Sequence, residues 1–300
     1  MEQYTDFAAV YDTFMDETPY DVWGDFVAGV IEKYGVSKPV RAGVKVDVVS
    51  GVDENSSSAS GEVAEDSVDA IGEIAENTDE ALEQERNLVV ELGCGTGSFT
   101  IEMAQKGYDI IGTDLSFEML DIARRKAAEQ GLDIMFLQQD MRELDLYCTT
   151  GTIVSVCDSI NYLLEDEDVI ETFRLVNNFL YPKGIFVFDF NTVHKYRDVI
   201  GDVTIAENRD DCSFIWDNYY NDEDHINEYD LTIFARCDDE DEIFRRSVET
   251  HYQRGYELSE MKSFVEKAGL EFVEAIDADT HETPTEDSER IYVIAREQGK

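Results

Sequence analysis

One short stretch of the chain decides the fold, and it reads Leu88-Val89-Val90-Glu91-Leu92-Gly93-Cys94-Gly95-Thr96-Gly97. Its first half is mostly apolar, and its second half has a glycine at every other position. The apolar run predicts a short buried strand, and the helical spacing of apolar residues over 98–106 predicts a helix after it. A strand, a glycine turn and a helix in this order predict the ligand-binding edge of an α/β sheet.

The spacing of the glycines separates this turn from a dinucleotide-binding turn. Rossmann dehydrogenases carry G-x-G-x-x-G, with the last glycine three residues after the second. Here the glycines are Gly93, Gly95 and Gly97, and residue 98 is a serine. Glycines let a backbone come close to a ligand and take conformations that are closed to other residues. A nicotinamide oxidoreductase is therefore the weaker alternative, although a glycine turn does not identify a ligand by itself.

Strand-like and helix-like segments alternate after the turn. We expect strands over 109–113, 134–138, 152–157 and 185–190, and helices over 116–130 and 166–180. Alternation of this kind predicts a parallel sheet with helices on both faces. Before the turn, apolar residues at three- and four-residue spacing predict two helices, over 7–14 and 19–34.

The pattern changes in the last third of the chain. Long alternating segments over 214–220, 225–236 and 243–252 predict an antiparallel sheet. A helical pattern over 258–268 and two strand-like segments, over 270–276 and 291–295, follow. Because these two segments flank a loop, we expect them to form an antiparallel pair at the edge of the main sheet.

The chain is strongly acidic. Its 300 residues include 68 Asp and Glu against 24 Lys and Arg, which gives a formal net charge of −44. Such a charge repels the phosphate backbone, so nucleic acid is an unfavourable partner. We expect a solvated acidic surface, with recruitment of a cationic substrate as the alternative. The acidic stretch over 40–86 has few aromatic residues, and we expect it to be a flexible insertion, with a marginal helix over 63–82 as the alternative.

Other classes of protein are disfavoured by what the sequence lacks. The five cysteines are scattered without a Cys-x-x-Cys pair, so we expect neither a disulfide framework nor a metal site. No apolar run is long enough to span a membrane, and the first residues do not resemble a signal peptide. We therefore expect a cytoplasmic protein with no membrane partner. The sequence does not indicate an oligomeric state.

Polar residues follow three further strands at the same edge of the predicted sheet. Asp114 lies about 20 residues beyond the turn, where a carboxylate accepts hydrogen bonds from ribose hydroxyls. Asp140-Met141 offers a carboxylate and an apolar side chain to an adenine ring. The segment Cys157-Asp158-Ser159-Ile160-Asn161-Tyr162 ends the next strand. Together with the turn, these residues predict a site for an adenosine-containing ligand.

These motifs resemble those of the class I S-adenosylmethionine (SAM) dependent methyltransferases. The resemblance rests on the turn over 91–97, the D-L-S-x-x-M-L segment over 114–120 and Gln139-Asp140-Met141. The segments over 7–12 and 157–162 are similar to those of a bacterial subgroup of small methyltransferases with an antiparallel lid after strand five. The implied fold is α/β: a Rossmann-like class I methyltransferase sheet with helices on both faces, plus an antiparallel β lid. The implied cofactor is SAM, with S-adenosyl-L-homocysteine (SAH) as product.

The resemblance also implies roles for individual residues. Glu91 and the backbone over 93–97 would hold the methionine moiety, Asp114 the ribose, and Asp140 the adenine amino group. Tyr11 would cover the pocket, and Trp23 would contact the amino-acid end of the cofactor. The full set of expected cofactor-binding residues is Tyr11, Trp23, Glu91, Gly93, Cys94, Gly95, Gly97, Asp114, Leu115, Met119, Asp140, Met141 and Cys157. Leu115 and Met141 would lie against the adenine faces, while Met119 fits a core position better than a cofactor wall.

The reaction needs a general base only if the acceptor arrives protonated, since SAM is already an activated methyl donor. Asp158 and His251 are the expected catalytic residues, with His194 and Tyr252 as further candidates by position. Each of them has a structural or exposed role as its alternative.

The acceptor is expected to be a small molecule that offers an oxygen or nitrogen nucleophile. The segment after the fourth strand lacks the Asn/Asp-Pro-Pro-Tyr/Phe pattern of nucleic-acid base methylation, and the chain has no Pro-Cys nucleophile. An RNA or protein methyltransferase and a non-catalytic SAM-binding regulatory protein remain as alternatives.

These expectations divide the chain into five parts. Residues 1–39 form helices that cover the cofactor site, and 40–86 form the acidic insertion. Residues 87–200 form the SAM-binding α/β core, 201–256 the substrate lid, and 257–300 a helix and strands that complete the core sheet.

Overall fold

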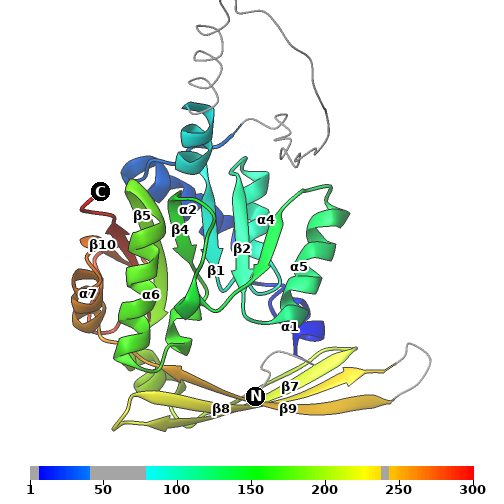
Figure 1. Ribbon diagram of the computed structural model, residues 1–300. Helices are drawn as coiled ribbons and strands as arrows, with labels where there is room; N and C mark the ends of the chain where they lie inside the picture. Colours follow the sequence, from blue (N-terminus) through cyan, green and yellow to red (C-terminus); the bar gives the residue numbers. More distant parts are fainter. Residues whose placement is uncertain (1–6, 41–78, 238–242) are drawn as a thin grey trace, which may run out of the picture.

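Two β-sheets organise the chain in the computed structural model, which describes residues 7–40, 79–237 and 243–300 (Figure 1). The large sheet contains β1 (Val89–Leu92), β2 (Ile110–Asp114), β3 (Met135–Gln138), β4 (Thr150–Ser155), β5 (Leu180–Asn191), β10 (Glu271–Asp277) and β11 (Arg290–Arg296). The small sheet contains β6 (Thr204–Asn208), β7 (Cys212–Asn221), β8 (Ile226–Arg236) and β9 (Phe244–Arg254). The main helices are α1 (Ala8–Phe14), α2 (Tyr20–Tyr34), α4 (Ser98–Gln105), α5 (Phe117–Glu129), α6 (Asp166–Phe179) and α7 (Leu258–Lys267).

The seven strands of the large sheet follow the order β10-β11-β5-β4-β1-β2-β3. β1 lies between β2 and β4 and runs parallel to both, with Val89 opposite Ile110 on one side and Thr152 on the other. β11 runs antiparallel to β5 and to β10. The predicted parallel sheet and its antiparallel edge pair are therefore confirmed, and the carboxyl ends of the five parallel strands share one edge.

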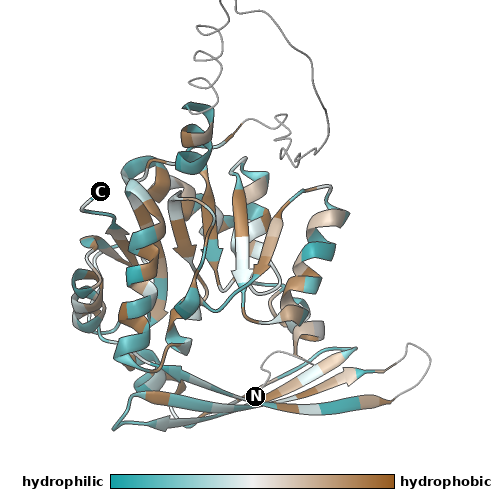
Figure 2. Ribbon diagram, in the orientation of Figure 1, coloured by the Kyte–Doolittle hydropathy of each residue, from teal (hydrophilic) through white to brown (hydrophobic). Residues whose placement is uncertain are grey.

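The alternation of side chains along β1 divides the core between the two faces of the large sheet. Val89 packs with residues of α2 and α4, while Val90 and Leu92 pack with residues of α6 and α7 on the opposite face. All four residues of β1 are buried, as expected for a parallel strand covered on both sides. Figure 2 shows the same layering, with hydrophobic residues in the strands and hydrophilic ones on the outward faces of the helices.

The small sheet lies across the carboxyl edge of the large one, with α1 between them (Figure 1). Its strands pair antiparallel in the order β6-β7-β8-β9, as the alternating segments predicted. Val10 of α1 joins Tyr229, Leu231 and Ile233 of β8 in one buried cluster. We call the small sheet the lid.

Some local features differ from the expectations. The π-helix over Lys195–Ile200, labelled η3, and β6 were not predicted, because their residues show neither helical nor alternating spacing over enough length. β5 begins at Leu180 rather than at the predicted residue 185. The later start was predicted because Pro182-Lys183-Gly184 has the composition of a turn. Within the predicted insertion, residues 79–86 belong to a helix that continues to residue 87, and 41–78 lie outside the described residues.

Candidate active site

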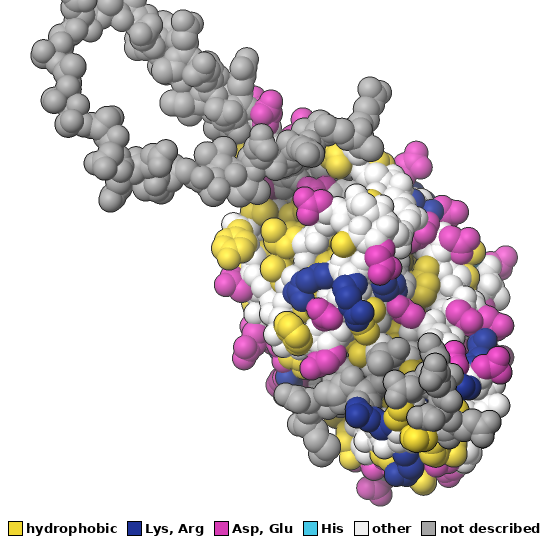
Figure 3. Space-filling view, turned by 90° about the vertical axis from the view of Figure 1, so that its right-hand side faces the viewer, with side chains coloured by type: hydrophobic (Ala, Val, Ile, Leu, Met, Phe, Trp, Pro, Cys, Tyr) yellow, Lys and Arg dark blue, Asp and Glu magenta, His cyan; other side chains and the backbone are white. Residues whose placement is uncertain are grey.

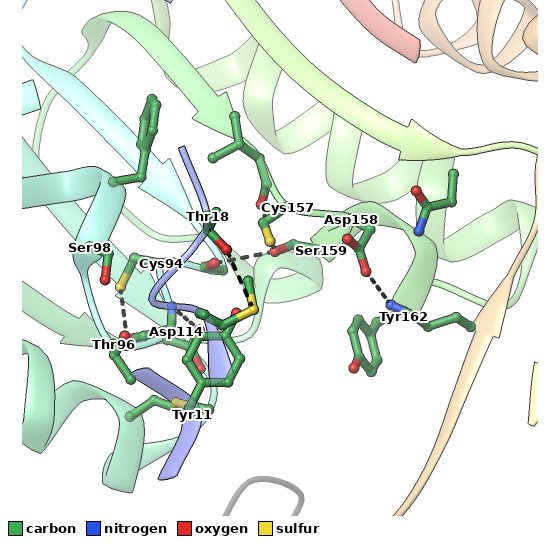
Figure 4. Close-up of a pocket in the computed structure, with 18 of the residues that line it drawn as sticks. Tyr11, Thr18, Cys94, Thr96, Ser98, Asp114, Cys157, Asp158, Ser159 and Tyr162 are labelled. Carbon is green, nitrogen blue, oxygen red and sulfur yellow. Dashed lines mark hydrogen bonds between the residues drawn. The ribbon is translucent and has the colours of Figure 1, made fainter. Parts of the chain in front are cut away.

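A cavity of about 1170 Å³ lies between the carboxyl edge of the large sheet and the lid (Figure 4). It is lined by the glycine turn, by the segments that follow β2, β3 and β4, by α1 and by the inner face of the lid. Ligand pockets commonly measure about 300 to 1000 Å³. The cavity is therefore large enough for a nucleoside-sized ligand and a second small molecule together.

The three glycines of the turn serve different purposes. All have positive φ, at 70° for Gly93, 53° for Gly95 and 75° for Gly97. A Cβ on Gly93 would lie 2.5 Å from Oγ of Ser159, and one on Gly97 would lie 2.9 Å from Cβ of Ala123, so close packing requires glycine at both. A Cβ on Gly95 would meet no atom within 4 Å. Because Gly95 lines the cavity, a side chain there would occupy space that a ligand can use.

Two carboxyl groups flank the turn. Asp114 accepts hydrogen bonds from the backbone N–H of Gly95 and of Ser116, both at 2.8 Å. Burial raises the pKa of Asp114. Glu91 is 2% exposed and accepts a hydrogen bond from the hydroxyl of Thr100. Burial raises the pKa of Glu91 to about 8, so this group holds a proton near neutral pH.

The expected adenine-binding residues lie at one end of the cavity but differ in their surroundings. Leu115 lines it and is 60% exposed, whereas Met119 is almost fully buried in α5. Met141 also lines the cavity. Asp140 lines it as well, but Arg142 donates to both of its carboxylate oxygens, at 3.0 and 2.6 Å. This ion pair lowers the pKa of Asp140 and holds its carboxylate ionised.

The loop after β4 has an unusual backbone. Cys157 and Asp158 are consecutive residues with positive φ, 63° and 56°, which is uncommon outside glycine. The buried carboxylate of Asp189 in β5 holds both, since it accepts from their backbone N–H groups at 3.0 and 2.8 Å. Burial raises the pKa of the Cys157 thiol to about 12, so it is neutral and not a nucleophile.

Arg290 at the start of β11 fixes the carboxylate of Asp158. Its guanidinium donates to Asp158 at 2.6 Å and to Asp189 at 3.3 Å, and the side-chain amide of Gln253 donates to the other oxygen of Asp158 at 2.7 Å. Both carboxylate oxygens of Asp158 therefore already accept a hydrogen bond from within the protein. This arrangement suits Asp158 to positioning rather than to proton removal.

The N-terminal segment closes one side of the cavity. Tyr11 and Trp23 both line it, and Figure 4 shows Tyr11 directed toward the glycine turn. Asp12 of α1 accepts from Oγ1 of Thr96 at 2.6 Å and pairs with Nζ of Lys126 at 2.7 Å. These bonds attach α1 to the turn and to α5.

The other candidate bases lie in different surroundings. His251 is fully buried behind Tyr162, whose hydroxyl lies 3.2 Å from its Nδ1. Tyr162 lines the cavity, as do Tyr229 and Tyr252, whereas His194 pairs with Asp198 outside it.

The sequence indicated no role for three residues of the site, namely Tyr162, Asp189 and Arg290. Tyr162 lies in the segment over 157–162, which the sequence places at the sheet edge. No local pattern indicates Asp189 or Arg290, because the fold brings them together from distant strands.

The residues fit SAM. Asp114 places a carboxylate at the cavity wall, where ribose hydroxyls can donate to it, and Gly95 leaves open space beside it. Among residues 7–40, 79–237 and 243–300, no group of three or more His, Cys, Asp or Glu is arranged to hold a metal ion. In the same residues, no helix is long and apolar enough to cross a membrane.

The sheet order and the cavity at the glycine turn define the class I SAM-dependent methyltransferase fold, and comparisons with known proteins agree. A family model described as a methyltransferase domain matches residues 89–184. Two chains whose names begin "Putative methyltransferase" match over nearly their full length. The one from Geobacillus sp. (strain WCH70) is 31% identical over 98% of this chain and 99% of its own. The other, YqeM from Bacillus subtilis (strain 168), is 30% identical over 98% and 96%.

A solved structure agrees in fold. The crystal structure of a SAM-dependent methyltransferase from Clostridium acetobutylicum ATCC 824 superposes with a TM-score of 0.74 at 22% identity, covering 99% of both chains. The chain belongs to the class I SAM-dependent methyltransferases, and SAM is its cofactor.

Proposed function

We propose that the chain transfers the methyl group of SAM to an oxygen or nitrogen atom of a small-molecule acceptor. The observation that carries this proposal is the cavity of about 1170 Å³, in which the glycine turn and the aromatic inner face of the lid line the same space. A cavity closed by a lid suits an acceptor that is enclosed rather than one that extends beyond the protein.

Cofactor binding is assigned to the residues around the turn. The backbone over 93–97 and Glu91 hold the methionine part, Asp114 the ribose, and Leu115, Asp140 and Met141 the adenine. Tyr11, Trp23, Cys94 and Cys157 complete the wall, with Met119 supporting it from the core. Bound SAM supplies an activated methyl group, since its sulfonium leaves with the electron pair of the carbon–sulfur bond. The protein then mainly has to align the acceptor atom with the methyl carbon.

The acceptor half of the cavity lies under the lid. Phe214, Trp216, Tyr229 and Tyr252 line it. The indole N–H of Trp216 is buried and has no hydrogen-bond partner among the described residues. We assign residues 87–200 to the core and 201–256 to the lid that covers the acceptor.

An RNA acceptor is less well supported. The side of the molecule that carries α5 shows acidic side chains around a few basic ones (Figure 3). Three consecutive basic residues of α5 bond within the protein: Arg124 to the carbonyl of Phe136, Arg125 to Asp121 and Lys126 to Asp12. Basic residues that are paired in this way are poorly placed to hold phosphates.

The proposal is tested by supplying methyl-labelled SAM to the purified protein in a lysate of its source organism. We expect label in one small-molecule fraction, and none when the protein is omitted. Label confined to protein or RNA would contradict the small-molecule acceptor, and binding of SAM without any transfer would contradict the activity itself.

The ribose assignment has its own test. Asp114→Ala removes the carboxylate that is proposed to bind two ribose hydroxyls, each worth roughly 1 kcal/mol. We expect SAM affinity to fall about 30-fold or more in isothermal calorimetry. Unchanged affinity would show that the ribose lies elsewhere.

A further inference from the structure

We propose that Tyr162 removes the proton of the acceptor and passes its own proton to His251, whose imidazolium is then stabilised by Glu249. This inference rests on the proposed methyl transfer. It names Tyr162 as the catalytic base at the cavity wall, and His251 and Glu249 as positioning residues that act through it.

The three side chains lie one after another along a path from the cavity into the lid. The hydroxyl of Tyr162 lies 3.2 Å from Nδ1 of His251. On the other side of the imidazole, Oε2 of Glu249 lies 3.6 Å from Nε2. Tyr162 follows β4, whereas His251 and Glu249 lie on β9. The lid therefore supplies His251 and Glu249, and the core supplies Tyr162, the residue that contacts the acceptor.

The carboxylate of Glu249 determines the direction of proton transfer. A carboxylate beside Nε2 favours a proton on that nitrogen, since two facing lone pairs would repel. Nδ1 then carries a lone pair, so the hydroxyl of Tyr162 donates to it. A tyrosine that donates to a neutral imidazole can give up its proton as it accepts one from the acceptor.

The surroundings strengthen these interactions. His251 has no exposed surface and Glu249 is 8% exposed, so little water competes with their charges. The ring of Tyr229 stacks on the imidazole, with centroids 4.9 Å apart and planes 10° apart, and its hydroxyl lies 2.9 Å from that of Tyr162. Burial raises the pKa of Tyr229, so its hydroxyl keeps its proton and can stabilise charge that develops on Tyr162.

The proton steps balance. The lone pair of the acceptor atom forms the new bond to the methyl carbon while its proton passes to Oη of Tyr162. The original proton of Tyr162 passes to Nδ1 of His251, and the positive charge ends on the imidazolium beside Glu249. Water then removes the extra proton once the product has left.

The relay limits the class of acceptor. It is useful to a hydroxyl or to a primary or secondary amine, each of which has both a lone pair to form the new bond and a proton to lose. A tertiary amine or a thioether has no such proton. We therefore infer that the acceptor atom is a hydroxyl oxygen or the nitrogen of a primary or secondary amine.

The first test does not require the acceptor. The chain has four histidines, so ¹⁵N-histidine NMR of the SAH-loaded protein, with His251→Gln for assignment, reports each ring nitrogen. We expect the resting His251 to carry its proton on Nε2 rather than on Nδ1, and its Nδ1 resonance to shift in Tyr162→Phe. A proton on Nδ1, or an imidazolium at rest, would overturn the relay, because His251 then has no site for the proton.

The second test uses the label-transfer assay. Tyr162→Phe should bind SAM with unchanged affinity but transfer label about 10²- to 10⁴-fold more slowly. It should also lose the dependence of the rate on pH that the relay predicts for the wild type. Glu249→Gln, which keeps an oxygen for the imidazole, should be slowed less.

The lid offers a matched control. The hydroxyl of Tyr220 lies 2.9 Å from Nδ1 of His225, but neither residue lines the cavity, and Tyr220 lines a second, smaller pocket on the lid. Tyr220→Phe should leave transfer unchanged. If Tyr162→Phe transfers label as fast as the wild type at every pH, the relay is refuted while the proposed function stands. If the wild type transfers nothing, the proposed function fails. The NMR experiment still tests whether Tyr162 donates a hydrogen bond to Nδ1 of His251.

Discussion

Glu91 shows how strongly burial at a single residue can set a property of the whole protein. Its carboxyl lies near the carboxyl end of β1, in contact with Thr100 and near Asp114, with almost no exposed surface. In the folded protein its pKa is raised from 4.5 to about 8. The folded state therefore keeps a proton on Glu91 at pH values where the unfolded chain has lost it.

This difference makes the stability of the protein depend on pH in a defined direction. Between pH 4.5 and 8 the folded state binds more protons at Glu91 than the unfolded state, so the free energy of unfolding falls as pH rises. Glu91→Gln removes this contribution. We expect the wild type to lose up to about 1 kcal/mol per pH unit relative to the variant, measured by urea unfolding from pH 5 to 8. The exposed Glu32→Gln should follow the wild type, and parallel curves for all three proteins would contradict the assignment.

At the scale of single elements, α1 is the part of the chain that touches both halves of the cavity. Asp12 bonds to Thr96 in the turn and to Lys126 in α5. The backbone N–H of Phe7 donates to Glu249 of the lid at 3.0 Å, and Phe14 packs edge-on against Phe214. A seven-residue helix is too short to be stable alone, so these contacts hold it in place.

Loosening α1 should therefore shorten the residence of the cofactor. Asp12→Ala removes the bonds to Thr96 and Lys126, and we expect SAM to dissociate about 10-fold faster in stopped-flow measurements. Asp21→Ala, at an exposed position in the first turn of α2, is the control. Equal dissociation rates in the two variants would mean that α1 does not retain SAM.

Most elements could be predicted from the sequence because their patterns are local. The strand before Gly93, the helix capped by Ser116 and the strands of the lid all follow from spacing within about ten residues. The link from Asp189 to Arg290 could not be predicted, since the two residues are 101 positions apart and meet only through the β5–β11 pairing. Likewise, His251 was named as a catalytic candidate by position, but the structure shows it one side chain away from the cavity wall.

At the scale of the whole molecule, the acidic composition affects the stability of the folded state more than any single ion pair does. The 68 acidic residues outnumber the 24 basic ones, so the carboxylates repel one another in the compact state. Salt screens this repulsion over a distance of about 10 Å at 0.1 M. The same salt weakens the surface ion pairs, but each of those contributes little.

The protein should therefore become more stable as salt is added. We expect the melting temperature to rise by several degrees between 0.05 and 0.5 M NaCl at pH 7 in differential scanning calorimetry. The rise should shrink at pH 4.5, where part of the carboxylates are protonated. A melting temperature that falls with salt would show that ion pairs, rather than net repulsion, dominate.

The position of α1 between the turn and the lid has a thermodynamic consequence. Since Asp12 bonds to Thr96 and the backbone of Phe7 bonds to Glu249, one short helix contributes to the walls that face both ligands. When the first ligand binds and orders α1, the loss of conformational entropy accompanies that first binding step. The second ligand then binds to a helix that is already ordered, so its own binding costs less entropy. The two affinities are then linked by a single coupling free energy: whatever factor SAM contributes to acceptor binding, the acceptor contributes equally to the binding of SAM.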